Sequence, residues 1–358
     1  MVQQIIGFTL FVIDVHTYYN WIIVFSILIF GYYNKSYTTT EKQPLLFFLS
    51  CLIGACLSLI IDRGLGTAFM NIFWILSGFI GYTVIKKNKI RLFFFDLLLI
   101  ALYIFFYYTY FSMIDIYEDH SYFDLNVYGH SSSNTVAIVL NFVVSTYYIL
   151  NKYYNAKRTK RILVFALINL VLIIIQQSRA GLLVASLLIL FLLIDLSSDL
   201  KNNINFKIGL ILLFFISYFV IVYIDTITLY LTENNIIQTR AGYENEARTM
   251  AQNSFFSQMT LRNFFLGYET DTTFALQNRT FNAFLDLWAK YGILPLLSFL
   301  FFFCRRIIYR KEYTIPISCF IPILTYCFFE SILFGTFWDF FIFVLLFLSK
   351  KQKTVSYL

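Results

Sequence analysis

The chain alternates between long apolar runs and short polar loops, and this pattern constrains its fold more than any other feature. Hydrophobic residues make up 59% of the 358 positions and charged residues only 13%. A soluble domain carries about 25% charged residues. Runs of about 20 apolar residues are long enough to cross a bilayer as helices. The pattern therefore predicts an all-α polytopic membrane protein.

The apolar runs predict eleven membrane spans in a single integral-membrane domain, residues 1–358. The expected spans are 4–33, 44–61, 67–85, 92–114, 132–150, 162–177, 181–195, 207–224, 281–304, 314–329 and 332–348. Polar residues interrupt the first run at Asp14, His16 and Asn20, and two short helices there would bring the total to twelve. The long polar segment 225–280 predicts one or two helices at the membrane surface.

The basic residues are distributed unequally between the two sides of the predicted bundle. Loops on one side hold all but seven of the 27 basic residues, and the positive-inside rule assigns this side to the cytoplasm. The seven on the outer side are Arg63, Arg179, Arg240, Arg248, Arg262, Arg279 and Lys290. Orientation does not require outer arginines, whereas a guanidinium suits a fixed anionic ligand. The cytoplasmic loops account for the net charge of +7, so no nucleic-acid partner is expected.

The sequence Ser178-Arg179-Ala180-Gly181 separates two apolar runs at the predicted outer face. Gly181 is expected to let the backbone turn tightly between two helices. The guanidinium of Arg179 can bind two phosphate oxygens with parallel hydrogen bonds. An arginine that extends toward lipid headgroups explains the same residue equally well.

Together with the apolar residues 182–185, this motif resembles the signature of the O-antigen ligase and repeat-unit polymerase superfamily. Further matches over residues 130–300 follow in the family's order: Ser133-Asn134-Thr135-Val136-Ala137, Glu246-Ala247-Arg248, Phe265-Leu266-Gly267-Tyr268, Asn282-Ala283-Phe284-Leu285 and Gly292-Ile293. There are two departures. The histidine that often precedes the family's helix-start asparagine is absent from residues 278–281, and Glu269 replaces a glycine.

The resemblance implies a GT-C-type glycosyltransferase of the polymerase branch, which makes O-antigen or capsular polysaccharide. Such an enzyme joins oligosaccharide units carried on undecaprenyl diphosphate, with inversion, at the outer face of the bacterial cytoplasmic membrane. The implied partners are these lipid-linked oligosaccharides, the lipid bilayer and a chain-length regulator protein. No Asp-x-Asp metal-binding pair occurs in the sequence. Arginines are therefore expected to stabilise the diphosphate leaving group without a metal or cofactor.

The resemblance also implies roles for individual residues. Arg179, Arg248 and Arg279 would bind and stabilise the diphosphate. The missing histidine leaves the family's general base unassigned, and Glu246 is chosen for that role because it is acidic and next to Arg248. The expected substrate-binding residues are Ser178, Gly181, Arg240, Asn282, Asn134 and His130. Other roles remain open for three of these positions. Arg240 has the spacing of a salt-bridge ladder with Glu244 and Arg248, His130 begins a polar cluster that fits a helix cap, and Arg279 fits an interfacial anchor.

Two alternatives to a polymerase remain. A ligase of the same superfamily would transfer a finished glycan to another acceptor, and the missing histidine counts against it. A transporter or flippase for the lipid-linked sugar is the second. Transporters tend to have internal repeats and helices broken near the membrane midplane. The sequence shows no internal repeat, and its polar residues are concentrated in the segment 225–280.

Overall fold

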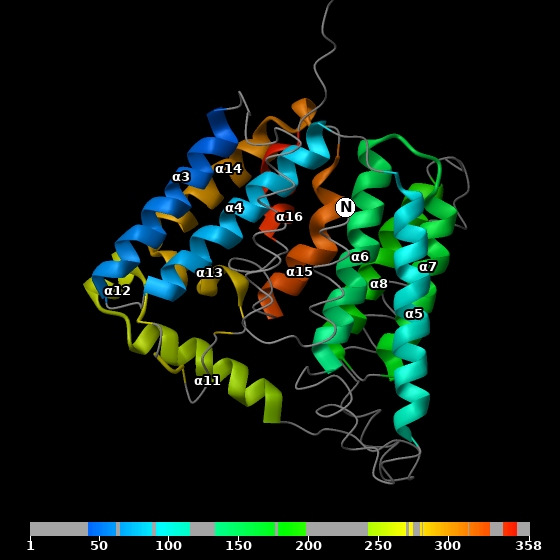
Figure 1. Ribbon diagram of the computed structural model, residues 1–358, viewed down its shortest axis with the longest axis horizontal. Helices are drawn as coiled ribbons and strands as arrows, with labels where there is room; N and C mark the ends of the chain where they lie inside the picture. Colours follow the sequence, from blue (N-terminus) through cyan, green and yellow to red (C-terminus); the bar gives the residue numbers. More distant parts are fainter. Residues whose placement is uncertain are drawn as a thin grey trace, which may run out of the picture. The chain divides into compact units, whose positions relative to one another are not determined.

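The computed structural model describes residues 42–61, 65–87, 91–114, 133–175, 178–197, 243–269, 272–274, 280, 282–313, 315–329 and 339–348. Within these residues the chain is helical and contains no β-strand, which confirms the all-α class (Figure 1). The expected spans 4–33 and 207–224 lie outside them. Two of the described helices are long and apolar enough to cross a membrane, over Lys42–Ile60 and Gly66–Lys86.

The chain divides into two compact units. Unit 1 comprises Met1–Ile23, Arg91–Thr249 and Ser318–Phe329. Unit 2 comprises Val24–Ile90, Met250–Ile317 and Glu330–Leu358. The S-R-x-G motif belongs to unit 1, and the family matches after residue 260 belong to unit 2.

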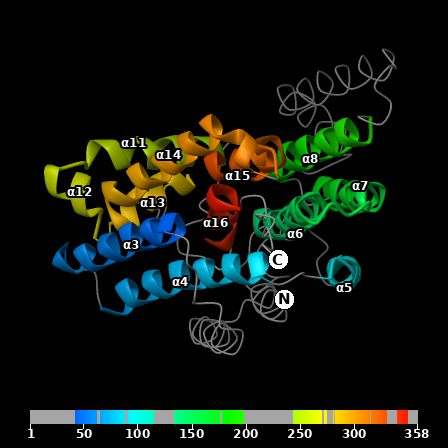
Figure 2. The same ribbon diagram turned by 90° about the horizontal axis from the view of Figure 1, so that it is seen from above.

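Unit 1 is built around helix α6 (Ser133–Tyr153). Its other described helices are α5 (Phe93–Ile114), α7 (Thr159–Ile175), α8 (Arg179–Ser197) and α15 (Ile321–Phe329), which follows the 3-10 helix η5 (Ile317–Phe320). Helix α6 packs against α5, α7, α8 and α15 and is buried throughout residues 137–151 (Figures 1 and 2). Helix α6 carries the buried polar residues Asn141, Ser145, Thr146 and Asn151, which favour contact with other helices over contact with lipid.

Two neighbouring tyrosines connect α6 to the helices on either side. The hydroxyl of Tyr147 donates to Oδ1 of Asp96 on α5 at 2.6 Å. The hydroxyl of Tyr148 donates to Oδ2 of Asp195 on α8 at 2.5 Å. Lys152 Nζ also lies 2.6 Å from Oδ2 of Asp195. A carboxylate is tolerated away from water only when such partners compensate its charge.

Asp96 is also the buried anion of an ion-pair cluster whose two arginines are partly exposed. Its Oδ2 accepts from Nη1 of Arg158 at 3.0 Å and from Nη1 of Arg161 at 2.8 Å. Arg158 lies in the basic loop between α6 and α7, and Arg161 lies in the first turn of α7. Asp96 lies in the first turn of α5, where the helix dipole also favours a negative charge. Here Asp96 has a structural role, because it holds the α6–α7 connection against α5.

Unit 2 is built around a short, completely buried helix. Its described helices are α3 (Lys42–Leu57), α4 (Leu65–Lys87), α12 (Leu261–Leu266), α13 (Ala283–Tyr291), α14 (Ile293–Ile308) and α16 (Phe340–Phe347), with the 3-10 helices η1 (Ser58–Ile61) and η4 (Arg310–Glu312). Helix α11 (Tyr243–Ser257) belongs to unit 2 from Met250 onward. Every residue of α16 is buried, and the helix packs against α3, α4 and α14.

Aromatic rings and small residues form the contacts of α16. The ring centroid of Phe343 lies 5.4 Å from that of Phe47 on α3 and 5.7 Å from that of Phe79 on α4. A Cβ added at Gly78 would lie 2.7 Å from the carbonyl carbon of Asp339, and one at Gly81 would lie 2.9 Å from Cβ of Phe340. Small residues of this kind let helix backbones approach closely within a membrane.

The structure corrects the expected span 281–304. The chain forms two helices there, α13 and α14, which meet at Gly292. Gly292 adopts a φ of +78°, a left-handed conformation that only glycine adopts readily. The amide of Gly292 still donates to the carbonyl of Trp288 at 2.8 Å, so it terminates α13 as a C-cap. The next helix therefore starts in a new direction.

The segment Arg305–Lys311, expected as a basic loop between the spans 281–304 and 314–329, also differs from expectation. Arg306 belongs to the last turn of α14 and is completely buried. Its guanidinium donates to the carbonyls of Val344 at 3.3 Å, Leu345, and Ile315 at 2.8 Å, and lies over the ring of Tyr313. Two of these carbonyls belong to the last turns of α16, where a helix dipole favours a cation.

Candidate functional site

The S-R-x-G motif forms the capped start of α8. Ser178 is buried, and its hydroxyl accepts a hydrogen bond from the amide of Gly181 at 3.2 Å. Its carbonyl accepts from the amide of Leu182 at 2.8 Å. Serine is a favoured N-cap because its side chain satisfies an amide at the start of a helix. Arg179 is consequently the first residue of a helix whose start is capped.

Gly181 lies within α8, so its expected role in a tight turn is wrong. A Cβ added there would lie 2.7 Å from Cβ of Ala137, 2.8 Å from Oγ of Ser178 and 3.0 Å from Cγ2 of Ile173. These three residues come from α6, from the α8 cap and from α7. The glycine is therefore required because three parts of unit 1 converge at the motif.

Two buried asparagines hold the motif against the neighbouring helices. Asn141 on α6 donates from Nδ2 to the carbonyl of Gly181 at 3.0 Å. Asn169 on α7 donates from Nδ2 to Oδ1 of Asn141 at 3.3 Å, and both side chains are fully buried. Sequence reasoning missed this pair. The available signal was an asparagine in the middle of each of two apolar runs, because interhelical hydrogen bonds are the usual reason to retain one in a membrane.

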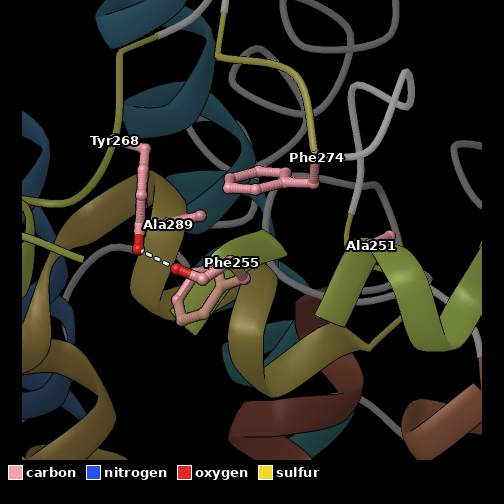
Figure 3. Close-up of a cluster of buried hydrophobic side chains, with 5 residues drawn as sticks. All are labelled: Ala251, Phe255, Tyr268, Phe274 and Ala289. Atoms are coloured by element: carbon pink, nitrogen blue, oxygen red, sulfur yellow. Dashed lines mark hydrogen bonds between the residues drawn. The ribbon is translucent and has the colours of Figure 1, made fainter. Parts of the chain in front are cut away.

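Described residues of the polar segment 225–280 form a small aromatic core with α13 in unit 2. Ala251 and Phe255 of α11 pack with Tyr268, Phe274 and Ala289, as Figure 3 shows. The Tyr268 ring centroid lies 4.8 Å from that of Phe255 and 5.1 Å from that of Phe274. The Tyr268 hydroxyl donates to the carbonyl of Phe255. Burial raises the pKa of Tyr268 to about 12, so this hydroxyl keeps its proton at neutral pH.

Gly267 and Gly292 each lie against the end of the other's helix. Gly267 ends α12 with a φ of +89°, and Gly292 ends α13 with a φ of +78°. A Cβ at Gly267 would overlap the carbonyls of Ala289 and Trp288, and a Cβ at Gly292 would overlap the carbonyl of Phe265. The amide of Tyr268 donates to the Ala289 carbonyl at 2.9 Å. Both positions therefore exclude any larger residue.

Asn282 is the N-cap of α13. Its Oδ1 accepts from the amides of Phe284 at 3.0 Å and Leu285 at 3.2 Å. The Thr280 hydroxyl donates to Oδ1 of Asp286 at 2.6 Å, and the Thr280 amide donates to the same oxygen at 3.2 Å. This carboxylate is buried in the first turn of α13, where the helix dipole favours a negative charge. The chain just after Arg279 is thus bonded to α13, and a substrate-binding role for Asn282 stays a prediction.

The structure does not describe the side chains of the remaining predicted site residues. Four lie on described helices without described side chains: Arg179 on α8, Asn134 on α6, and Glu246 and Arg248 on α11. Arg248 precedes Ala251 by three residues, so it lies one turn before the aromatic core. Three others, His130, Arg240 and Arg279, lie outside the described residues. The roles of all seven remain predictions.

The exposed residues Arg262 and Glu269 lie beside the glycine pair. Arg262 donates from Nη2 to the carbonyl of Ile60 at 3.1 Å, and its Nη1 lies 3.9 Å from Oε1 of Glu269. Water screens such an exposed pair, so we expect it to contribute less than about 1 kcal/mol to stability. The Arg262 guanidinium connects α12 to η1 through the Ile60 carbonyl.

We compared the chain with known proteins, and no family model, curated protein or solved structure matches it.

Proposed function

We propose that this chain is a polysaccharide repeat-unit polymerase. It is a GT-C-like protein of eleven spans in the bacterial cytoplasmic membrane, with residues 225–280 as a large extracytoplasmic loop. It joins oligosaccharide units carried on undecaprenyl diphosphate on the extracytoplasmic side. The motif order described above and the apolar helices support this proposal.

The assembly of the sequence matches in unit 2 is the observation that carries the proposal. Leu266-Gly267, Asn282 and Gly292 are separated along the chain, yet the first and last are in contact and the second caps the helix between them. Helix α11 joins the same core through Ala251 and Phe255, one turn after Arg248. The matches from Leu266 to Gly292 therefore belong to one local framework of unit 2.

The proposed reaction requires a base and a cationic site. An acceptor hydroxyl loses its proton to a general base, which we assign to Glu246, and its oxygen attacks the anomeric carbon of the donor. The bond from that carbon to the diphosphate oxygen breaks, and the electron pair leaves with the lipid diphosphate. Preorganised positive charge stabilises the developing anion. We assign this role to Arg179, Arg248 and Arg279, without a metal ion.

A reconstituted assay with a synthetic lipid-linked repeat unit tests the proposal. Arg248→Ala is expected to lower kcat by about 10²- to 10³-fold, as the loss of one electrostatic donor does in other enzymes. Arg248→Lys keeps the charge but loses the planar fork, so it should recover only part of the rate. Arg262→Gln is the matched control, because Arg262 is an exposed arginine of the same segment outside the motifs.

Product length gives a second, independent readout. A polymerase makes a ladder of glycans that differ by one repeat unit, and the ladder should shorten in Arg248→Ala but not in Arg262→Gln. An Arg248→Ala protein with the wild-type rate would remove the central role assigned to this arginine. Transfer of a glycan without lengthening would identify a ligase instead. Translocation without a new glycosidic bond would identify a transporter.

A further inference from the structure

The loop before α7 and the first turn of this helix carry an excess of positive charge. Five cations lie between positions 152 and 161: Lys152, Lys157, Arg158, Lys160 and Arg161. Asp195 pairs with Lys152, and Asp96 pairs with both arginines. Five positive charges and two carboxylates leave a local net charge of +3. Lys157 and Lys160 are exposed, and neither forms an ion pair within the part of the chain that the structure describes.

One face of α7 continues from these lysines as an exposed apolar stripe. Its members are Val164, Leu167, Ile168, Val171 and Ile174, each between 40% and 57% exposed. They follow Lys160 at spacings of three and four residues, so they share its helix face. The opposite face, with Ile162, Ala166, Asn169 and Ile173, is at most 1% exposed and packs within unit 1.

The length of the stripe matches one leaflet of a bilayer. Ten residues separate Val164 from Ile174, which corresponds to about 15 Å along a helix. The hydrocarbon core of a bilayer is about 30 Å thick, so one leaflet spans about 15 Å. Lys160 precedes Val164 by four residues, about 6 Å along the helix, so it lies just beyond the hydrocarbon, at the depth of lipid headgroups.

We propose that Lys157, Lys160 and the exposed face of α7 form a binding site for an anionic phospholipid of the surrounding bilayer. The headgroup phosphate contacts the two lysines, and an acyl chain lies along Val164–Ile174. Asp96 pairs with both arginines, whereas Lys157 and Lys160 have no carboxylate partner among the described residues, so the lysines are the cations assigned to the headgroup. Flexible ammonium groups suit a phosphate that has no fixed orientation. A zwitterionic lipid carries a cation that the excess positive charge of this loop repels. The site does not depend on the proposed polymerase activity.

Lipid titration of the delipidated full-length protein in detergent, followed by native mass spectrometry, tests the site. Phosphatidylglycerol and phosphatidylcholine with identical acyl chains are the probes. The variant Lys157→Gln/Lys160→Gln should bind phosphatidylglycerol about 5- to 30-fold more weakly, because each surface cation contributes about fivefold to anionic lipid binding. The matched control Arg310→Gln/Lys311→Gln removes two exposed cations of η4 and should keep most of the affinity. Lys157→Arg/Lys160→Arg should bind as the wild type does.

Cross-linking locates the lipid directly. A phosphatidylglycerol with a photoreactive group on its acyl chain should label residues 164–174 in liposomes, and less so in the glutamine variant. Equal binding of the two lipids by the wild type would overturn the proposal. So would unchanged phosphatidylglycerol binding in the glutamine variant, or labelling confined to other helices. Because the arginine variant keeps the charge, a loss of binding there as well would attribute the effect to folding and contradict the charge mechanism.

Discussion

Gly267 and Gly292 close helices α12 and α13 against each other, because a Cβ on either glycine would overlap carbonyl groups at the end of the other helix. Each glycine also has a positive φ. The two requirements are independent, since one concerns the backbone of the glycine and the other the space beside it. Together they explain why glycine occurs at both positions.

We expect Gly267→Ala or Gly292→Ala to lower the free energy of unfolding by about 2–5 kcal/mol, the combined effect of left-handed strain and overpacking. Thermal unfolding followed by circular dichroism measures the loss. Gly66→Ala is the control in the same unit, because a Cβ at Gly66 meets no atom within 4 Å. That change should stabilise α4 by about 0.5–1 kcal/mol. Equal stability of the Gly267 and Gly66 variants would contradict the overlap.

The contact between Gly181 and Ala137 predicts a compensating pair of substitutions. Gly181→Ala alone should destabilise the protein by about 1–3 kcal/mol, because the added methyl group overlaps Ala137 and the Ser178 cap. Ala137→Gly in the same chain removes one of the two overlapping methyl groups and should recover part of the loss. A double-mutant cycle on unfolding temperatures measures this coupling. Additive effects would show that α6 and α8 do not approach each other at these residues.

The two carboxylates that bond to α6 should differ in importance. The Asp96 side chain is 6% exposed and accepts from two arginines, whereas that of Asp195 is 22% exposed. Asp96→Asn should therefore destabilise the protein by about 1.5–3 kcal/mol, and Asp195→Asn by about 1 kcal/mol or less. Thermal unfolding of both variants at low and high salt gives the ranking. A larger loss in the Asp195 variant would refute it.

The pKa of Tyr268 predicts a pH dependence of stability. Burial raises this pKa to about 12, above the value of about 10 for an unfolded chain. The folded state therefore holds the Tyr268 proton more tightly than the unfolded chain does. The resulting contribution to the free energy of unfolding is complete below pH 10 and is lost as the pH rises toward 12. The unfolding temperature of the wild type should fall more steeply over that interval than that of Tyr268→Phe. Parallel slopes would mean that Tyr268 titrates normally.

Long apolar runs predicted several of the described helices closely. The expected spans 67–85, 92–114 and 181–195 correspond to α4, α5 and α8 within two residues at each end. Apolar length is a local property, so a single sequence reveals it. The break at Gly292 was missed because an isolated glycine in an apolar run does not reveal the sign of its φ. The burial of Arg306 depends on carbonyls 38 and 39 residues away, which no local pattern identifies.

The sequence identified candidate residues, but it did not predict which other residues they contact. Ser178 and Asn282 have side chains that cap helices, a role that their position before an apolar helix could have indicated. The role of Gly181 was misread, because the closeness of Ala137 depends on the packing of α6. Asn141 and Asn169 lie in different runs, and their hydrogen bond appears only once the helices are assembled.

Tyr147 and Tyr148 are adjacent on α6 but bond to different helices, α5 and α8. Rotation of α6 about its long axis would lengthen one or both of these phenol hydrogen bonds. Lys152 of α6 also pairs with Asp195, so α6 and α8 are joined twice. We therefore expect α5 and α8 to follow when α6 moves.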